Sequence, residues 1–161
     1  MGPTGSKIFL GIFFGIFLVV GIGVSILGVQ TTQKSIASDN WPQTQGTIIT
    51  SDIETHKTHT KHGYSYTYGP EIVYTYSVNG QSYTANKVSY STGSSSDVSY
   101  AQKIVNTYPV GTQIPVFYNP ENPTEAVLEP GSNTMTYFPI IFGIVFIAVG
   151  IGGIIYIIRS N

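Results

Sequence analysis

The stretch IFLGIFFGIFLVVGIGVSILGV, residues 8–29, contains no charged side chain and decides the fold class of this chain. A second stretch of the same kind, FPIIFGIVFIAVGIGGIIYII, covers residues 138–158. At about 1.5 Å of rise per residue, each stretch would form a helix of about 31 to 33 Å, which matches a hydrocarbon core of about 30 Å. We therefore expect two transmembrane helices.

These two helices set the expected domain boundaries. We expect tails at residues 1–7 and 159–161, and one polar domain at residues 30–137 whose core covers about residues 41–131. The first apolar stretch is longer than the apolar part of a signal peptide, which has about 7 to 15 residues. We therefore expect it to remain uncleaved.

The basic residues beside the helices predict the orientation in the cell membrane. Lys7 precedes the first stretch and Arg159 follows the second, and neither tail contains an acidic residue. The polar domain is longer than the loops whose charge controls topology, so the tails decide the orientation. We expect both termini to be cytoplasmic and the domain to lie outside.

Composition excludes several classes of protein and site. The chain has no cysteine, so disulfides and thiolate metal sites are impossible. The polar domain has five lysines and eight carboxylates, a net charge of −3. It therefore lacks the basic surface that nucleic-acid binding needs, and we do not expect such binding. Neither apolar stretch contains the ionisable residues that mark an ion path, so transport by this chain alone is not expected.

Small side chains lie along one side of each predicted membrane helix, where they let helix backbones approach closely. Those expected to serve in helix packing are Gly11, Gly15, Gly21, Ser25, Gly28, Gly143 and Gly150. Three interpretations remain open. The two helices pack on each other, they pack on other copies or foreign helices, or the glycines have no packing role.

Between the two helices, apolar and polar residues alternate with the period of β-strands. Residues 44–53 are rich in β-branched side chains, and residues 72–78 alternate regularly. Asn79-Gly80 follows at once and predicts a type I′ turn, because both central positions of that turn need positive φ. A third strand at Ser82–Tyr90 is then expected to pair antiparallel with the second, with a bulge near residues 86–87.

The rest of this region predicts one helix and two more strands. Apolar residues recur at helical spacing from Val98 to Tyr108, and Pro109 ends the helix. A fourth strand is expected at residues 114–118, where Pro115 favours an edge or bulged position, and a fifth at residues 125–129. The expected fold class is an α+β membrane protein in which two transmembrane helices flank a five-stranded, mainly antiparallel β domain with one short helix.

The order of several residues resembles that of a known family. They are Trp41, Gln45-Gly46-Thr47-Ile48, Pro70-x-Ile72-x-Tyr74-x-Tyr76-x-Val78-Asn79-Gly80-x-x-Tyr83, Tyr108-Pro109-x-Gly111 and Val116-Phe117-Tyr118-Asn119-Pro120-x-Asn122-Pro123-x-x-Ala126-Val127-Leu128-Glu129. This order is similar to the family filed as domain of unknown function 3592, and its most specific part is Tyr118–Pro123. The resemblance implies a membrane-anchored fold of this layout. It carries no catalytic residue, because the biochemical role of the family is not established.

Residues 55–68 are longer and richer in His and Tyr than that family pattern, and they contain all three histidines, His56, His59 and His62. Imidazole is a common ligand of zinc and copper, so a turn here would form a metal site from these rings. On an extended strand, however, side chains three residues apart point to opposite faces. A solvated hairpin loop and a pH-sensitive contact are the alternatives, and no other cofactor is expected.

The tyrosines of this segment are spaced by two, so Tyr64, Tyr66 and Tyr68 would share one face of a strand. Such a face offers a stacking surface to a sugar or a partner protein. The alternative is a cross-strand aromatic ladder that continues to residues 74 and 76. Trp41 and Tyr137 lie near the outer ends of the membrane helices, where they fit the role of interfacial anchors.

The chain contains no Gly-x-Ser-x-Gly elbow, His-Glu-x-x-His motif or phosphate-binding Gly-Lys-Ser/Thr loop, so we expect no enzymatic activity. Our first hypothesis is a non-catalytic accessory or assembly subunit of a larger integral-membrane complex, in contact with lipid and with other membrane subunits. The alternative is a free-standing cell-envelope module that binds metal or saccharide through residues 55–68. An enzyme of unrecognised type is a third hypothesis.

Overall fold

The computed structural model describes residues 3–61 and 63–160. The chain divides into two compact units, which we describe separately. A helical unit contains the residues up to Lys34 and from Asn133 onward, and a sheet unit contains Ser35–Ser132.

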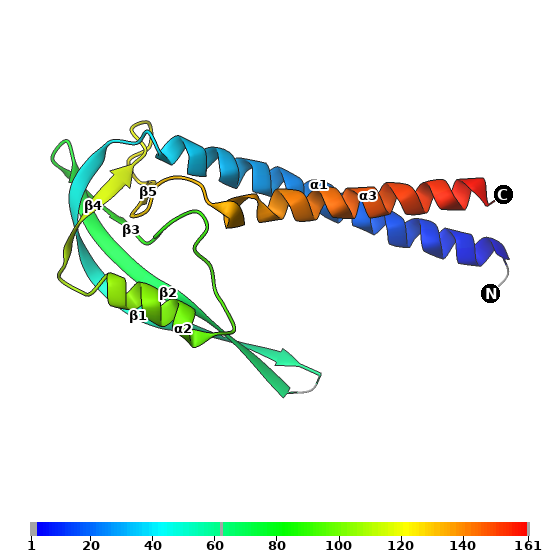
Figure 1. Cartoon of the computed structure of the whole chain (residues 1–161), viewed down its shortest axis with the longest axis horizontal. Coiled ribbons are helices and arrows are strands. Elements are labelled where there is room, and N and C mark those ends of the chain that lie inside the picture. Colours follow the sequence, from blue (N-terminus) through cyan, green and yellow to red (C-terminus); the bar gives the residue numbers. More distant parts are fainter. Residues whose placement is uncertain (1–2, 62, 161) are drawn as a thin grey trace. The chain divides into compact units, whose positions relative to one another are not determined.

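The helical unit contains α1 (Pro3–Ser38) up to Lys34 and all of α3 (Phe138–Arg159). The two helices run antiparallel, and the chain ends lie at the same end of the pair in Figure 1. Both helices are long and apolar enough to cross a membrane. The Lys7 ammonium donates to the carbonyl oxygen of Ser160 at 3.4 Å. This contact gives a partner to one carbonyl at the end of α3, where a positive charge also suits the helix dipole.

Helix α1 is longer than the apolar stretch within it. It continues past Val29 to Ser38, because no Gly or Pro interrupts that polar segment, and it ends before Pro42, which restricts the preceding residue. The apolar stretch therefore leads directly into further turns of polar helix.

Helix α3 follows a short 3-10 helix, η1 (Thr134–Tyr137). The Asn133 side chain accepts from the backbone N–H groups of Met135 and Thr136, and Thr136 Oγ1 accepts in return from Asn133 N at 3.1 Å. Thr32 Oγ1 of α1 donates to the carbonyl oxygen of Thr136 at 3.2 Å, and both residues are buried. A polar contact thus joins the two helices at the end where the apolar stretches stop.

The contact between α1 and α3 includes five of the small residues expected to serve in packing, namely Gly21, Ser25, Gly28, Gly143 and Gly150. A Cβ on Gly28 would lie 3.0 Å from the backbone nitrogen of Ile140, and one on Gly150 would lie 3.0 Å from the carbonyl oxygen of Phe14. Around Gly11 and Gly15 nothing lies within 4 Å of such an atom. The packing role of these last two residues stays a prediction.

The sheet unit contains five antiparallel strands in the order β3-β2-β1-β4-β5. The bounds are β1 (Gln43–Thr60), β2 (Gly63–Val78), β3 (Gln81–Ala85), β4 (Gln113–Tyr118) and β5 (Ala126–Val127), with α2 (Val98–Thr107) between β3 and β4. The expected layout of a five-stranded antiparallel sheet with one short helix, between two long apolar helices, is confirmed. So is the β2–β3 turn, because Asn79 and Gly80 have φ values of 51° and 82°.

Two strands are shorter than predicted, for one shared reason. The carbonyl oxygen of Val88 accepts from the N–H groups of Leu128 and Glu129, so these residues contact each other instead of extending the sheet. Consequently β3 ends at Ala85 and β5 contains two residues. The bulge expected near residues 86–87 is wrong, and the irregularity lies in β1 between Ile48 and Thr50.

Pro115 lies where β4, in the described part of the chain, has no strand on its outer side, so its missing backbone N–H leaves no hydrogen bond of the sheet unmade. It pairs with Gln45 of β1, whereas β5 pairs only with Phe117 and Tyr118. On the side away from β1, the described residues therefore place no strand beside Pro115, which meets the expectation of an edge position.

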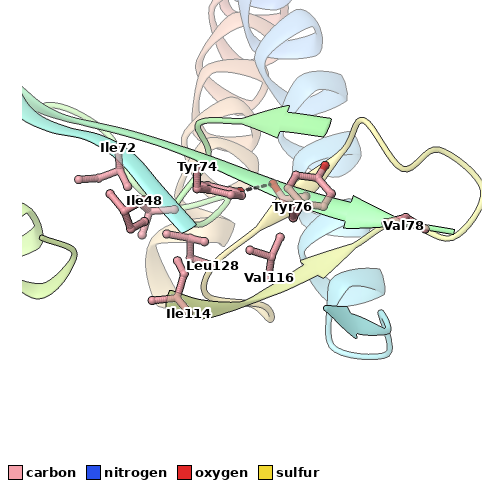
Figure 2. Packing of buried hydrophobic residues seen from close by; sticks show 10 residues of the cluster. Ile48, Ile72, Tyr74, Tyr76, Val78, Ile114, Val116 and Leu128 are labelled. Atoms are coloured by element: carbon pink, nitrogen blue, oxygen red, sulfur yellow. Dashed lines mark hydrogen bonds between the residues drawn. The ribbon is translucent and has the colours of Figure 1, made fainter. Parts of the chain in front are cut away.

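The core lies on one face of the sheet and is drawn in Figure 2. Alternate residues of β2 point into it because side chains of a strand alternate between faces, and they join residues from β1, β4 and the segment after β5. The labelled members are Ile48, Ile72, Tyr74, Tyr76, Val78, Ile114, Val116 and Leu128. Helix α2 packs on the same core through Ile104 and Val105, and the Asp97 carboxylate caps it by accepting from Ser99 N at 2.9 Å.

Candidate functional site

The strands β1 and β2 continue beyond the rest of the sheet as a two-stranded ribbon, which we call the arm (residues 55–61 and 63–68). Within it, Thr55–Thr60 pairs with Gly63–Tyr68 in unbroken antiparallel register. Figure 1 shows this pair of strands projecting past α2. Most of this segment is thus paired strand, as the spacing of its tyrosines predicts, so its side chains have fixed faces.

The base of the arm is held by the loop that follows β3. Tyr68 N donates to the carbonyl oxygen of Ser95 at 2.7 Å, and Ser95 N donates to that of Tyr68 at 2.9 Å. A Cβ on Gly69 would lie 2.7 Å from Ser94 Oγ, so glycine allows this close approach. The arm therefore projects from a base that two backbone hydrogen bonds at Tyr68 hold in place.

One side of the arm, which we call the tyrosine face, combines aromatic and basic groups. Lys57 lies opposite Tyr66 and His59 lies opposite Tyr64, and residues directly opposite on paired strands share a face. Lys57 Nζ lies 3.6 Å from the ring centroid of Tyr64 and 5.9 Å from that of Tyr66. The His59 ring meets Tyr64 edge to face at 5.3 Å. These are cation–π and aromatic contacts between exposed groups, each of modest strength.

The tyrosine face remains open to partners despite these contacts. Tyr64 is 59% exposed and Tyr66 is 42% exposed, whereas Tyr74 and Tyr76 on the same strand are buried. Large apolar rings held on a rigid ribbon lose little entropy when a partner covers them. Tyr68 is half-buried at the base of the arm, so it belongs to the support more than to the open surface.

The structure does not bring the His56 and His59 side chains together. His56 lies opposite Thr67 and His59 opposite Tyr64, three positions apart along β1, so their rings are on opposite faces. His56 Nε2 lies 3.4 Å from Glu54 Oε2, while His59 contacts Tyr64. His62 lies outside the described residues. Within residues 3–61 and 63–160, no three His, Asp or Glu side chains form a group that could hold a metal ion.

The expected aromatic ladder is divided into two parts. Five residues of strand separate Tyr68 from Tyr74, and two of them, Pro70 and Ile72, lie on the same face as the tyrosines. In the core, Tyr74 contacts Tyr76 at 6.0 Å, and Tyr76 stacks on Tyr83 at 5.8 Å. The arm tyrosines are therefore a separate group with their own environment.

Lys57 is the arm residue whose place sequence reasoning missed. The sequence assigned it no role, whereas the structure places its ammonium above the tyrosine rings. The signal was present, because Lys57 and His59 are spaced by two, as the tyrosines are. This spacing places Lys57 with the tyrosines only once the register of the hairpin is known.

A family model described as Domain of unknown function (DUF3592) matches residues 44–133, which is more than half of the chain. The chain belongs to this family. None of the curated proteins compared with the chain matches it. The DUF3592 region begins within β1 and includes the whole arm, the sheet core and the turn between β4 and β5.

The most specific DUF3592 segment, Tyr118–Pro123, is a structural turn in this chain. Asn119 N donates to the carbonyl oxygen of Glu125 at 2.8 Å, and Asn119 Oδ1 accepts from Glu121 N at 3.0 Å. The Tyr76 hydroxyl donates to the carbonyl oxygen of Pro123 at 2.6 Å, which fastens the turn to the core. Through these hydrogen bonds, polar groups of the segment shape the turn and hold it against the core.

The tyrosine–carboxylate pairs of the DUF3592 region also serve the fold. The Tyr90 hydroxyl donates to Glu125 Oε1 at 2.8 Å, and the Tyr108 hydroxyl donates to Glu129 Oε1 at 2.7 Å. Burial raises the pKa of both hydroxyls, and the hydrogen bond to a negatively charged partner raises each pKa further. Both tyrosines thus stay neutral donors across the physiological range. The arm remains the best candidate for a functional surface.

Proposed function

We propose that this chain is a non-catalytic accessory or assembly subunit of a larger integral-membrane complex, held in the membrane by α1 and α3. The exposed tyrosine face of a braced, projecting arm carries this proposal, because such a surface suits contact with another protein. The proposed non-catalytic role is supported by the sequence, which contains none of the common catalytic motifs.

The exposure of the long helices supports insertion into a membrane. Only 11% of the most apolar part of each helix is buried within the structure. Soluble proteins rarely expose apolar surfaces of this extent, whereas lipid would cover them. Tight glycine contacts between α1 and α3 fit the same proposal, since small residues let helices pack where water expulsion cannot drive association.

The proposed orientation has both termini in the cytoplasm and the sheet unit outside. Lys7 and Arg159 support it through the preference of cytoplasmic flanks for basic residues. A protease added to intact cells would then cut the arm near Lys57 or Lys61. Cleavage that requires permeabilised cells would contradict this orientation.

Mild-detergent purification of the full chain, followed by native mass determination, tests the proposed function. We expect other membrane subunits to co-purify at fixed stoichiometry. A matched variant in which residues 56–67 are replaced by Asn-Gly keeps the Thr55–Tyr68 pair and the contact with Ser95, and should lose those subunits. A lone monomer from the unaltered chain would overturn the proposal.

A second candidate function is a free-standing cell-envelope module that binds saccharide. The exposure of Tyr64 and Tyr66 favours it, because sugar rings stack on open tyrosine rings. Binding of copper or zinc at the histidines would require the arm to rearrange, since His56 and His59 lie on opposite faces. Titration of zinc into the native chain and a variant lacking all three histidines tests the metal part, and equal affinities would remove it.

A further inference from the structure

The charges of the sheet unit are divided between the arm and the remainder. Residues 55–68 contain Lys57 and Lys61 and no carboxylate, whereas the rest of Ser35–Ser132 contains two lysines and eight carboxylates. The net charges are therefore +2 for the arm and −6 for the remainder, counting histidine as neutral. A segment of one sign projecting from a body of the opposite sign attracts a negatively charged partner to the arm.

The arm also offers an unpaired backbone edge. β4 pairs with Gln43–Thr47 of β1, and Ile48 bonds to residues 111 and 112, so pairing on that side stops there. Along Thr55–Thr60, the described residues place no strand on the outer side of β1. Open strand edges accept an extended segment of another chain through main-chain hydrogen bonds.

From these two observations, we propose that the β1 edge of the arm binds an extended acidic segment of a partner protein, with carboxylates of that segment opposite Lys57 and His59. This inference rests on the proposed function, because it names the chemistry of the partner that the accessory subunit would contact. The partner strand would add to β1 as a further antiparallel or parallel strand.

The spacing of the side chains favours a peptide over an anionic sugar polymer. Lys57 and His59 are two residues apart on one strand, so they repeat at about 6.8 Å, which is also the repeat of side chains on one face of any added strand. Every second residue of the partner therefore meets the tyrosine face in the same way. A sugar polymer would use neither this repeat nor the open backbone edge.

The other face of the arm adds a condition on the partner. His56 and several hydroxyl side chains lie there, and Glu54, which precedes the arm, lies 3.4 Å from His56. The residues of the partner that point to this side should therefore not be acidic. The structure thus assigns the bound segment an alternation of acidic residues with hydroxyl or basic residues.

A peptide of alternating threonine and glutamate is the probe, titrated against the full chain in mild detergent by fluorescence anisotropy. We expect binding that weakens with added salt and weakens by up to about fivefold for Lys57→Gln. Lys103→Gln, which removes an exposed lysine of α2, is the matched control and should bind as the unaltered chain does. Replacing glutamate by glutamine in the peptide should reduce the affinity as well.

Two versions of the peptide, N-methylated on complementary sets of alternate residues, test pairing with the edge. An added strand directs alternate N–H groups toward β1, so one version should lose binding and the other should keep it. Equal binding of both versions would overturn strand addition. Competition by a polygalacturonate fragment equal to that of the peptide would overturn the choice of a protein partner, and so would no binding of the peptide.

The failure of this inference can be distinguished from that of the proposed function. If subunits still co-purify with the Lys57→Gln chain while the peptide shows no binding, the accessory role stands and the acidic-strand inference is wrong. If the unaltered chain purifies alone, the proposed function fails whatever the peptide does.

Discussion

A Cβ atom on Gly21 would lie 2.8 Å from the carbonyl oxygen of Gly143, and a Cβ atom on Gly143 would lie 2.8 Å from the carbonyl oxygen of Gly21. The relationship is reciprocal because the two glycines face each other where α1 crosses α3. Neither backbone can accept a side chain at this point without the helices moving apart.

Gly21→Leu should therefore destabilise the helical unit. We expect the free energy of unfolding in detergent to fall by about 1–3 kcal/mol, as for overpacked cores, measured by circular dichroism during denaturation. Gly11→Leu is the matched control, because nothing lies within 4 Å of a Cβ there. Equal losses for the two variants would contradict the crossing at Gly21.

Tyr74→Phe should destabilise the sheet unit although the ring stays in place. The Tyr74 hydroxyl lies 2.8 Å from the carbonyl oxygen of Lys87 and 3.0 Å from that of Ala126, and the side chain is fully buried. Removing the donor should cost about 1–2 kcal/mol, because the buried carbonyl group of Ala126 and the part-buried one of Lys87 lose their partner. Urea denaturation measures the change. Tyr64→Phe, on the exposed arm, should remain within about 0.5 kcal/mol of the unaltered chain.

Gly131→Ala should also destabilise the sheet unit. Gly131 has a φ of 90°, and a Cβ there would collide with the Asp39 carboxylate. Its backbone is fixed on both sides, since Gly131 N donates to Ser38 Oγ at 2.9 Å and its carbonyl oxygen accepts from Ser35 Oγ at 2.6 Å. We expect a loss of about 1–3 kcal/mol in the same denaturation experiment.

Gly93→Ala provides the comparison for that variant. Gly93 has open space around it and does not have a positive φ, so its replacement should change stability little. A loss at Gly131 no larger than that at Gly93 would show that the backbone of Gly131 relaxes freely.

Local patterns predicted much of this fold because local chemistry controls those elements. The β2–β3 turn needs positive φ at Asn79 and Gly80, and α2 follows from the helical spacing of its apolar residues. The unpredicted features depend on distant partners. β3 and β5 are short because Val88 bonds to Leu128 and Glu129, about forty positions along the chain, and no nearby residue reports such a contact.

The candidate site was predictable in position but not in geometry. The density of His and Tyr marked residues 55–68, yet two readings of that segment, loop or ribbon, give different faces. The observed register places Lys57 with Tyr66 and His56 on the other side. A shift of one residue would have exchanged the faces, so pairing decides which side chains meet.

Alkaline pH should destabilise the sheet unit through its buried tyrosines. Burial is the main cause that raises the pKa of Tyr74, and it also raises the pKa values of Tyr90 and Tyr108. In the unfolded chain these hydroxyls lose their protons near a pH of about 10. Above that pH the folded state holds more protons than the unfolded state, so the free energy of unfolding falls as pH rises.

This contribution is fully present below about pH 10, and for Tyr74 its loss approaches about 1.4 kcal/mol per pH unit above that value. Urea denaturation at several values between about pH 8 and 11 measures it, with the ionisation of tyrosine followed by ultraviolet absorbance. Tyr74→Phe should start less stable but show a shallower fall, because it lacks the group that resists ionisation. Tyr64→Phe leaves the Tyr74 hydroxyl in place, so it should keep the full slope. If Tyr74→Phe and the unaltered chain lose stability in parallel, the buried hydroxyl is not the group responsible.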